Sequence, residues 1–188
     1  IKDSNASNRL DERALRLYGE AIEINGVTVW LSPAGHILGS SQVVVEHKGL
    51  RMVFTGDYKR RWDPTCPQFE PVENTHVFIS EATFGLPVFR HPPTEHEIDR
   101  LMRSVADNPD RTHCIGAYSL GTAQRVIKHL RLAGHDRPIY IHGSLEKLCE
   151  VYEAAGVTLG ELRPATLEDR SKAAREAFRG EIVIAPPG

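Results

Sequence analysis

Two side chains that commonly bind metal ions each lie at the end of an apolar, strand-like run. His36 lies in Ser32-Pro33-Ala34-Gly35-His36-Ile37-Leu38-Gly39-Ser40, and Asp57 lies in Phe54-Thr55-Gly56-Asp57-Tyr58. Imidazole and carboxylate groups both suit Zn²⁺ and related divalent ions, and a carboxylate can bridge two ions. We therefore predict that His36 and Asp57 belong to a hydrolytic metal site. The alternative for each is structural, a histidine bonded to a loop carbonyl or an aspartate in a turn.

The composition is that of an ordinary globular protein. The chain has 188 residues, 26% charged and 40% hydrophobic, enough for one large domain or two small ones. A formal net charge of −2 excludes a whole-surface attraction to nucleic acid but permits a local basic groove. Three cysteines without a C-x-x-C pair predict reduced thiols in a cytoplasmic protein. No apolar run is long enough to span a membrane, so we expect no membrane partner.

Residues 19–85 are predicted to be rich in strands. Two hairpins are expected, over residues 20–31 around Asn25-Gly26 and over residues 41–54 around Lys48-Gly49. A short strand, His76 to Ser80, follows. Strands without an intervening helix predict an antiparallel sheet with one buried face.

After Pro92-Pro93 the hydrophobic period changes to alternating strands and helices. A helix with a capping box is expected from Thr94, with Glu97 as the reciprocal partner. The elements expected after it are strands over residues 112–117, 138–141 and 181–185 and helices over residues 120–130, 145–152 and 167–178. This alternation predicts a parallel α/β domain, with domains over residues 1–88 and 89–188.

Two strand-to-helix turns of the second domain are candidate contacts for phosphate groups. The residues concerned are Tyr118, Ser119 and Gly121 in the first turn and His142 and Ser144 in the second. Free backbone N–H groups and the helix dipole at such a turn attract anions, and the carboxyl ends of parallel strands share one edge of a sheet. The alternative is that both turns only cap helices.

The motif order resembles a known family. The His36 and Asp57 segments are similar to the third and fourth metal motifs of the metallo-β-lactamase fold in its nucleic-acid-processing branch. Ser80-Glu81-Ala82-Thr83-Phe84-Gly85 resembles the acidic motif that opens the inserted β-CASP domain of that branch. The two strand-to-helix turns resemble those of β-CASP nucleases. The segments closest to bacterial DNA-ligase-associated exonucleases are Gly56-Asp57-Tyr58-Lys59, Asp63-Pro64-Thr65-Cys66, Phe69-Glu70-Pro71 and Thr83-Phe84-Gly85-Leu86-Pro87.

The resemblance implies a fold and a function. The fold is part of a metallo-β-lactamase αββα sandwich followed by a β-CASP-like parallel α/β domain. The function is metal-dependent hydrolysis of nucleic-acid phosphodiesters by a DNA exonuclease in DNA repair or end processing, with a DNA ligase as a partner. Two Zn²⁺ ions, or Mn²⁺, would be held partly by His36 and by a bridging Asp57. Glu81 would orient a metal-binding histidine or hold a proton near the leaving group, and Lys59 would contact the nucleic-acid backbone.

The family's first metal motif, His-x-His-x-Asp-His, has no match in the 188 residues, and its late histidine motifs have none either. We therefore expect the chain to be an internal piece of a longer protein, truncated at both ends, inactive alone and at most a weak zinc binder. Two other functions stay open. One is a metallo-hydrolase of the same fold acting on a small molecule such as a thioester, although such enzymes need no α/β insertion. The other is a non-catalytic nucleic-acid-binding module.

Overall fold

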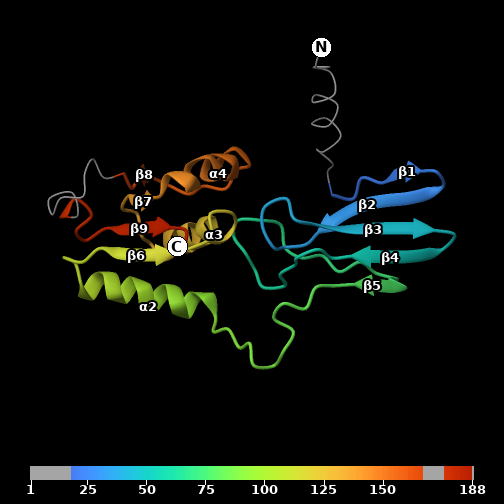
Figure 1. Ribbon diagram of the computed structural model, residues 1–188, viewed down its shortest axis with the longest axis horizontal. Helices are drawn as coiled ribbons and strands as arrows, with labels where there is room; N and C mark the ends of the chain where they lie inside the picture. Colours follow the sequence, from blue (N-terminus) through green and yellow to red (C-terminus); the bar gives the residue numbers. More distant parts are fainter. Residues whose placement is uncertain (1–17, 167–175, 188) are drawn as a thin grey trace, which may run out of the picture. The chain divides into compact units, whose positions relative to one another are not determined.

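The computed structural model describes residues 18–166 and 176–187, which divide into two compact units (Figure 1). The first unit contains the described residues up to Trp62 together with Cys66–Thr83. The second contains Asp63–Thr65 and the described residues from Phe84 onward. The helix predicted over residues 167–178 lies largely outside the described residues. In the part of the chain that the structure describes, no helix has the length and apolar character needed to cross a bilayer.

The first unit is built on one five-stranded sheet. Its strands, in spatial and chain order, are β1 (Ile22–Ile24), β2 (Val27–Pro33), β3 (Ser41–His47), β4 (Leu50–Phe54) and β5 (Val77–Ile79). Both predicted hairpins are confirmed. Asn25 and Gly26 have φ angles of 52° and 80°, and Lys48 and Gly49 have 49° and 79°. Positive φ at both central residues is the mark of a type I′ turn, whose twist matches that of the strands it joins.

The expectation of an all-antiparallel sheet is wrong at its last strand. β5 pairs with β4 in parallel, with Met52 opposite Val77 and Phe54 opposite Ile79. The chain leaves β4 at one end of the sheet and returns through residues 55–76 to the other end before it enters β5. A connection of that length permits a parallel crossover, which a two-residue turn does not.

One face of this sheet is buried, as predicted. Val44 and Val53 are fully buried and lie opposite each other in the β3–β4 register. Gln42 is on the same face of β3, and its amide donates to the carbonyls of Pro33 at 2.9 Å and Glu70 at 2.7 Å. Gln42 thereby fastens the 55–76 connection to the end of the sheet where β2 terminates.

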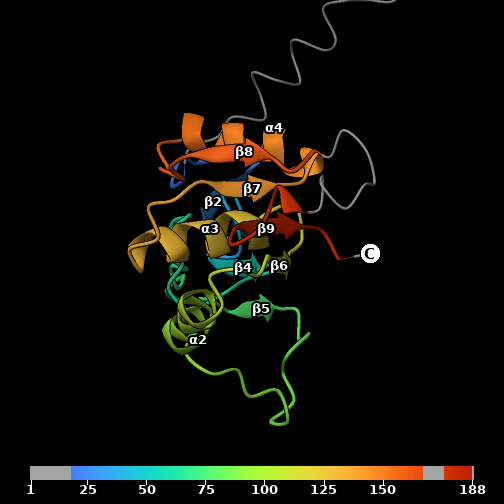
Figure 2. The same cartoon turned by 90° about the vertical axis from the view of Figure 1, so that its left-hand side faces the viewer.

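The second unit is an α/β structure with a parallel sheet, which confirms the predicted fold class. Its strands are β6 (His113–Gly116), β7 (Ile139–Ile141), β8 (Leu162–Pro164) and β9 (Ile182–Ala185), and its helices are α2 (Thr94–Asp107), α3 (Thr122–Leu132) and α4 (Gly143–Ala154). The strand order is β6-β9-β7-β8, and every pair is parallel (Figure 2). All four carboxyl ends therefore lie at one edge of this sheet.

The helices bury part of each stripe that their periodicity predicts. Ile98 of α2 is buried, as are Ala123, Ile127 and Leu130 of α3 and Leu145, Cys149 and Tyr152 of α4. The capping box expected at Thr94 is wrong. Pro93 is the N-cap of α2 and no side chain caps the helix, because Thr94 is already its first helical residue. β8 was not expected, since it is a three-residue strand at the sheet edge that ends in proline.

Candidate metal centre and nucleic-acid-binding turns

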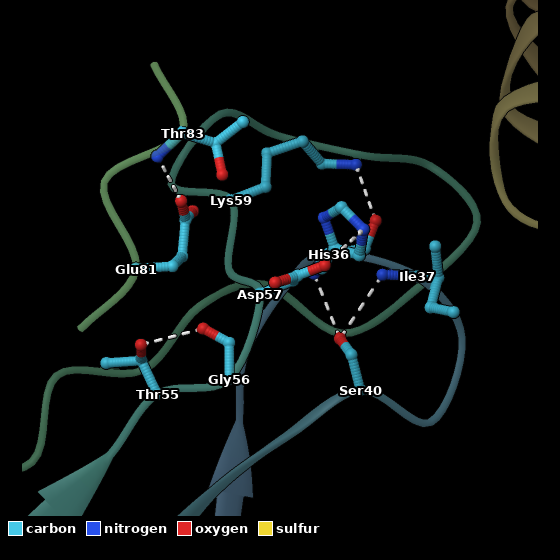
Figure 3. A network of polar contacts seen from close by, with 9 residues as sticks. All are labelled: His36, Ile37, Ser40, Thr55, Gly56, Asp57, Lys59, Glu81 and Thr83. Carbon is cyan, nitrogen blue, oxygen red and sulfur yellow. Dashed lines mark hydrogen bonds and ion pairs between the residues drawn. The ribbon is translucent and has the colours of Figure 1, made fainter. Parts of the chain in front are cut away.

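His36 and Asp57 lie side by side at one end of the first unit's sheet (Figure 3). His36 is in the loop that joins β2 to β3, and Asp57 follows β4. Because β2 and β4 run in the same direction on either side of β3, their carboxyl ends share an edge. His36 Nε2 is 4.0 Å from Asp57 Oδ2, and the two side chains are 43% and 73% exposed. The structure thus brings the two predicted metal ligands together.

The loop that carries His36 is fixed by its neighbours. Gly35 has a φ of +70°, and a Cβ there would lie 2.5 Å from the Lys59 carbonyl oxygen and 2.6 Å from the Phe69 nitrogen, so only glycine fits. The Ser40 hydroxyl accepts the backbone N–H groups of His36 at 2.9 Å and Ile37 at 3.2 Å. These contacts hold the His36 backbone in place beside the end of β4.

Lys59, predicted to contact a nucleic-acid backbone, braces this loop. Its ammonium group donates to the His36 carbonyl oxygen at 3.0 Å, and its backbone N–H donates to the Ala34 carbonyl at 3.0 Å. An ammonium group has three donors. One donor is therefore used to position His36, and a contact to phosphate would need another.

Glu81 follows β5 and lies in the same unit (Figure 3). Its Oε2 accepts the Thr83 backbone N–H at 2.6 Å. Hydrogen bonds from Thr83, a further one from the Tyr58 backbone and the charge of His36 hold the pKa of the Glu81 carboxyl below its usual value. The group is therefore ionised at neutral pH. An ionised carboxylate can accept a hydrogen bond, which suits the orienting role predicted for Glu81.

The His36–Asp57 geometry fits part of a metal site. Zinc binds histidine nitrogen at about 2.0–2.1 Å and carboxylate oxygen at about 2.0–2.2 Å, which at a tetrahedral angle places the two atoms about 3.4 Å apart. His36 Nε2 and Asp57 Oδ2 are 4.0 Å apart, so they need to approach by only about 0.6 Å for one ion to bind both. Among the described residues, no group of three or more His, Cys, Asp and Glu side chains is placed to hold a metal ion. Since catalytic zinc sites use three protein ligands and structural sites four, His36 and Asp57 supply two of a larger set.

In the second unit the two predicted turns meet. The Ser119 hydroxyl after β6 lies 3.3 Å from the Ser144 hydroxyl after β7. The Ser144 hydroxyl is also 2.9 Å from His142 Nδ1. His142 is the N-cap of α4, and its Nδ1 accepts the Ser144 backbone N–H at 3.2 Å. An Nδ1 that accepts leaves the ring proton of neutral His142 on Nε2, a donor on an exposed side chain.

Three of the backbone N–H groups expected to be free at the start of α3 are already bonded. The Gly121 N–H donates to Gln124 Oε1 at 2.8 Å. The next two, those of Thr122 and Ala123, donate within the turn to the carbonyls of Leu120 and Tyr118, each at 3.1 Å. A phosphate at this turn would therefore meet the Ser119 hydroxyl rather than these amides. Tyr118 itself is 71% exposed, and Gly121 is buried.

Gln124 is the residue that sequence reasoning missed. It is fully buried, and its amide group donates to the Ser119 carbonyl at 2.9 Å and to the Cys149 sulfur at 3.5 Å. Together with the hydrogen bond from the Gly121 N–H, these contacts fix the backbone of the Ser119 turn from its buried side. The available signal was a glutamine three residues after the glycine that precedes α3, the spacing of a capping-box partner.

Comparison with known proteins identifies relatives. No family model matches the chain. It is 33% identical over 169 residues to a "Probable DNA ligase" of Opitutus terrae, covering 86% of this chain and 15% of that protein. It is 31% identical over 145 residues to "Endoribonuclease YSH1" of Saccharomyces cerevisiae, covering 70% of this chain and 18% of that protein. The chain is 31% identical over 147 residues to the "Cleavage and polyadenylation specificity factor subunit 3-I" of Arabidopsis thaliana, covering 70% of this chain and 20% of that protein.

The chain thus spans between 15% and 20% of the length of these three relatives. Among solved structures, a protein of unknown function from Enterococcus faecalis V583 matches with a TM-score of 0.57 and 12% identity, covering 92% of this chain and 44% of that one. At 12% identity, the similarity to the Enterococcus faecalis structure concerns the fold alone. The motif order and the sequence relatives together show that the chain belongs to the metallo-β-lactamase-fold family, in its nucleic-acid-processing, β-CASP-like branch.

Proposed function

We propose that the protein carrying this chain is a metal-dependent nuclease that hydrolyses phosphodiester bonds in nucleic acid. The observation that carries the proposal is the pairing of His36 Nε2 with Asp57 Oδ2 across 4.0 Å at one edge of a sheet. An imidazole on a braced loop with a carboxylate beside it is a ligand pair that suits a divalent ion. The sequence similarity to proteins named as an endoribonuclease and as a DNA ligase supports nucleic acid as the substrate.

We propose further that this nuclease is a DNA exonuclease that acts in DNA repair or end processing, together with a DNA ligase. Support comes from the similarity to the Opitutus protein over 86% of the chain. The competing substrate is RNA, which is favoured by the similarity to Endoribonuclease YSH1 over 70% of the chain. Digestion of DNA and RNA strands of one sequence distinguishes the two substrates.

Each predicted site residue of the first unit has a proposed role. Two Zn²⁺ ions, with Mn²⁺ as the alternative, would supply Lewis acidity at the phosphodiester. Asp57, with two oxygens, would hold both ions, and His36 would bind one through Nε2. Glu81, kept ionised by the Thr83 amide, would orient a metal-binding histidine by accepting its ring N–H. Lys59 would keep the His36 loop in register with Asp57.

The turns of the second unit are proposed to contact the nucleic-acid strand. The Ser119 and Ser144 hydroxyls and the His142 Nε2–H are donors that suit phosphate oxygens. Gly121 gives its turn the required backbone, with a φ of 84°, and the exposed Tyr118 ring is available to a base. A cytoplasmic location is proposed from the cysteines, since Cys66, Cys114 and Cys149, all among the described residues, are thiols and not disulfides.

The test is metal analysis of the full-length protein combined with digestion of end-labelled strands. Single-stranded DNA, duplex DNA and RNA of one sequence should be compared with and without a chelator. We expect bound zinc or manganese, chelator-sensitive cleavage and stepwise shortening of DNA from one end. Metal without any cleavage would instead favour the small-molecule hydrolase. Tight nucleic-acid binding without metal would favour a non-catalytic module.

A further inference from the structure

An exposed cluster of aromatic rings follows the acidic motif. Phe84 is 62% exposed and Phe89 is 45% exposed, although both are large apolar side chains. Their ring centroids are 5.4 Å apart with planes at 81°, and Phe84 makes a second edge-on contact with His91 at 5.2 Å and 89°. Soluble proteins seldom leave contiguous apolar groups in water without a function for them.

The backbone holds these rings in a defined arrangement. The Phe89 N–H donates to the Leu86 carbonyl at 3.0 Å, and the Arg90 N–H donates to the Val88 carbonyl at 3.0 Å. Proline occupies positions 87, 92 and 93, which restricts φ between and after the rings. A ligand that binds the rings would therefore meet side chains whose backbone is already ordered, at a low cost in conformational entropy.

The local charge indicates what that ligand is. Residues 84–93 contain Arg90 and His91 and no Asp or Glu. The charge within this segment thus favours an anion, and the Arg90 guanidinium can pair with a phosphate. Perpendicular rings leave aromatic faces that are not covered by one another, because an edge-on contact uses one face of one ring. Flat bases attached to phosphates fit both features.

We propose that Phe84, Phe89 and His91 form a stacking platform for the bases of single-stranded nucleic acid. The inference rests on the proposed function and narrows it to a substrate class. Bases within a duplex are stacked on each other, whereas those of a single strand or a frayed end are available to aromatic side chains. The platform therefore selects single strands or ends over intact duplex. It reads no sequence, since every base has an aromatic face.

A protein partner is the competing occupant, and Leu86 and Val88 distinguish it. These aliphatic side chains are 64% and 76% exposed in the same segment. A protein interface would bury them together with the rings, whereas base stacking needs the rings alone. The aliphatic substitution therefore distinguishes the two occupants, because it would weaken a protein interface and leave base stacking unchanged.

The experiment measures binding of labelled oligonucleotides to the full-length protein by fluorescence anisotropy. One strand carries bases, and a second of the same length carries abasic sites, both with phosphorothioate linkages that resist cleavage. The Phe84→Leu/Phe89→Leu double variant keeps apolar volume and loses the rings, and Leu86→Ala/Val88→Ala is the matched control. Phe84→Tyr keeps a ring and should bind as the parent does.

We expect the ring variant to bind the base-containing strand at least roughly fivefold more weakly, with its affinity for the abasic strand unchanged. The aliphatic control should match the parent on both strands. Equal losses on both strands, no loss, or a loss in the aliphatic control alone would overturn the platform. Digestion by the parent is scored separately. A parent that cuts nothing but shows the base-dependent loss would sink the nuclease proposal and leave the platform standing.

Discussion

The hydroxyl oxygens of Ser119 and Ser144 lie 3.3 Å apart, although β9 separates the strands that precede them. Two helix starts that are distant in sequence therefore present one joint polar surface. His142 extends it, since its Nδ1 is 2.9 Å from the Ser144 hydroxyl. This contact makes the two turns a single candidate site for a nucleic-acid strand rather than two independent helix caps.

The first prediction concerns that joint surface. Ser119→Ala combined with His142→Ala should weaken single-stranded DNA binding by the full-length protein without changing its metal content. Parent binding should fall steeply with added salt, because Lys and Arg contacts to phosphates release counterions, and the variant should bind more weakly than the parent at both salt concentrations. The measurement is a titration of labelled oligonucleotide at two salt concentrations. Ser104→Ala, at the far end of α2, is the control. Equal affinity of parent and variant at both salts would mean that the turns only cap helices.

A second prediction compares two glycines of the His36 loop. Gly39 has a φ of +80° with nothing within 4 Å of an added Cβ, so Gly39→Ala should cost only the left-handed backbone strain, about 1–2 kcal/mol. Gly35→Ala adds a collision with the Lys59 and Phe69 backbones and should destabilise further. The Gly35→Ala variant should also bind less zinc than the parent, because the collision displaces the neighbouring His36. Urea unfolding and metal analysis give the two readouts. Equal behaviour of the two variants would contradict the close packing at Gly35.

The third prediction concerns the buried amide of Gln124. Gln124→Leu leaves the Gly121 N–H and the Ser119 carbonyl without their side-chain partner, and each unsatisfied buried group costs about 1–3 kcal/mol. We expect the free energy of unfolding to fall by at least that amount. Gln68→Leu, at an exposed glutamine, serves as the control and should change little. An equally small effect at both positions would show that the Ser119 turn does not depend on Gln124.

A fourth prediction follows from His135, which is buried at the end of α3. Burial first, and then the charges of Arg131 and Arg137, lower the pKa of His135 in the folded state. The unfolded state therefore binds a proton at higher pH than the folded state does. Stability should be fully present above about pH 6.5 and should decline as pH falls below it towards the folded pKa.

His135→Gln removes this titration. The variant should lose less unfolding free energy than the parent between pH 7 and pH 5, as measured by urea unfolding at each pH. His96→Gln, at an exposed position of α2, should keep the parent's pH dependence. If the parent and His135→Gln decline in parallel, the acid sensitivity has another source.

The sequence predicted well those parts of the fold that depend on neighbouring residues, such as the hairpins. Asn25-Gly26 and Lys48-Gly49 specify type I′ turns, and the strands around them follow from alternation alone. The parallel pairing of β5 could not be predicted, because it depends on the path of residues 55–76 across the sheet. The order β6-β9-β7-β8 was equally inaccessible, since β9 is inserted between strands that precede it in the chain.

In the candidate site, too, some features could be predicted from the sequence and others could not. His36 and Asp57 could be identified because each ends a strand, and strand direction then brings them to one edge. The lowered pKa of Glu81 could not be predicted, because it arises from hydrogen bonds of Thr83 and Tyr58 that only the folded loops bring to the carboxyl group. At α3, the start of a helix suggested free amides, but the Gln124 side chain and two turn carbonyls already bind them. Side-chain competition of this kind leaves little trace in spacing.

The most direct test of the central claim is the activity and metal content of Asp57→Asn in the full-length protein. The amide keeps the shape of the carboxylate and loses the charge that attracts cations. We expect the variant to fold as the parent does by circular dichroism, to bind less metal and to lose nuclease activity by at least about a hundredfold, as His36→Ala should too. Asp110→Asn, at an exposed carboxylate of the second unit, should keep full activity. Near-normal digestion by Asp57→Asn, with its metal retained, would contradict the proposal that His36 and Asp57 belong to the catalytic metal site.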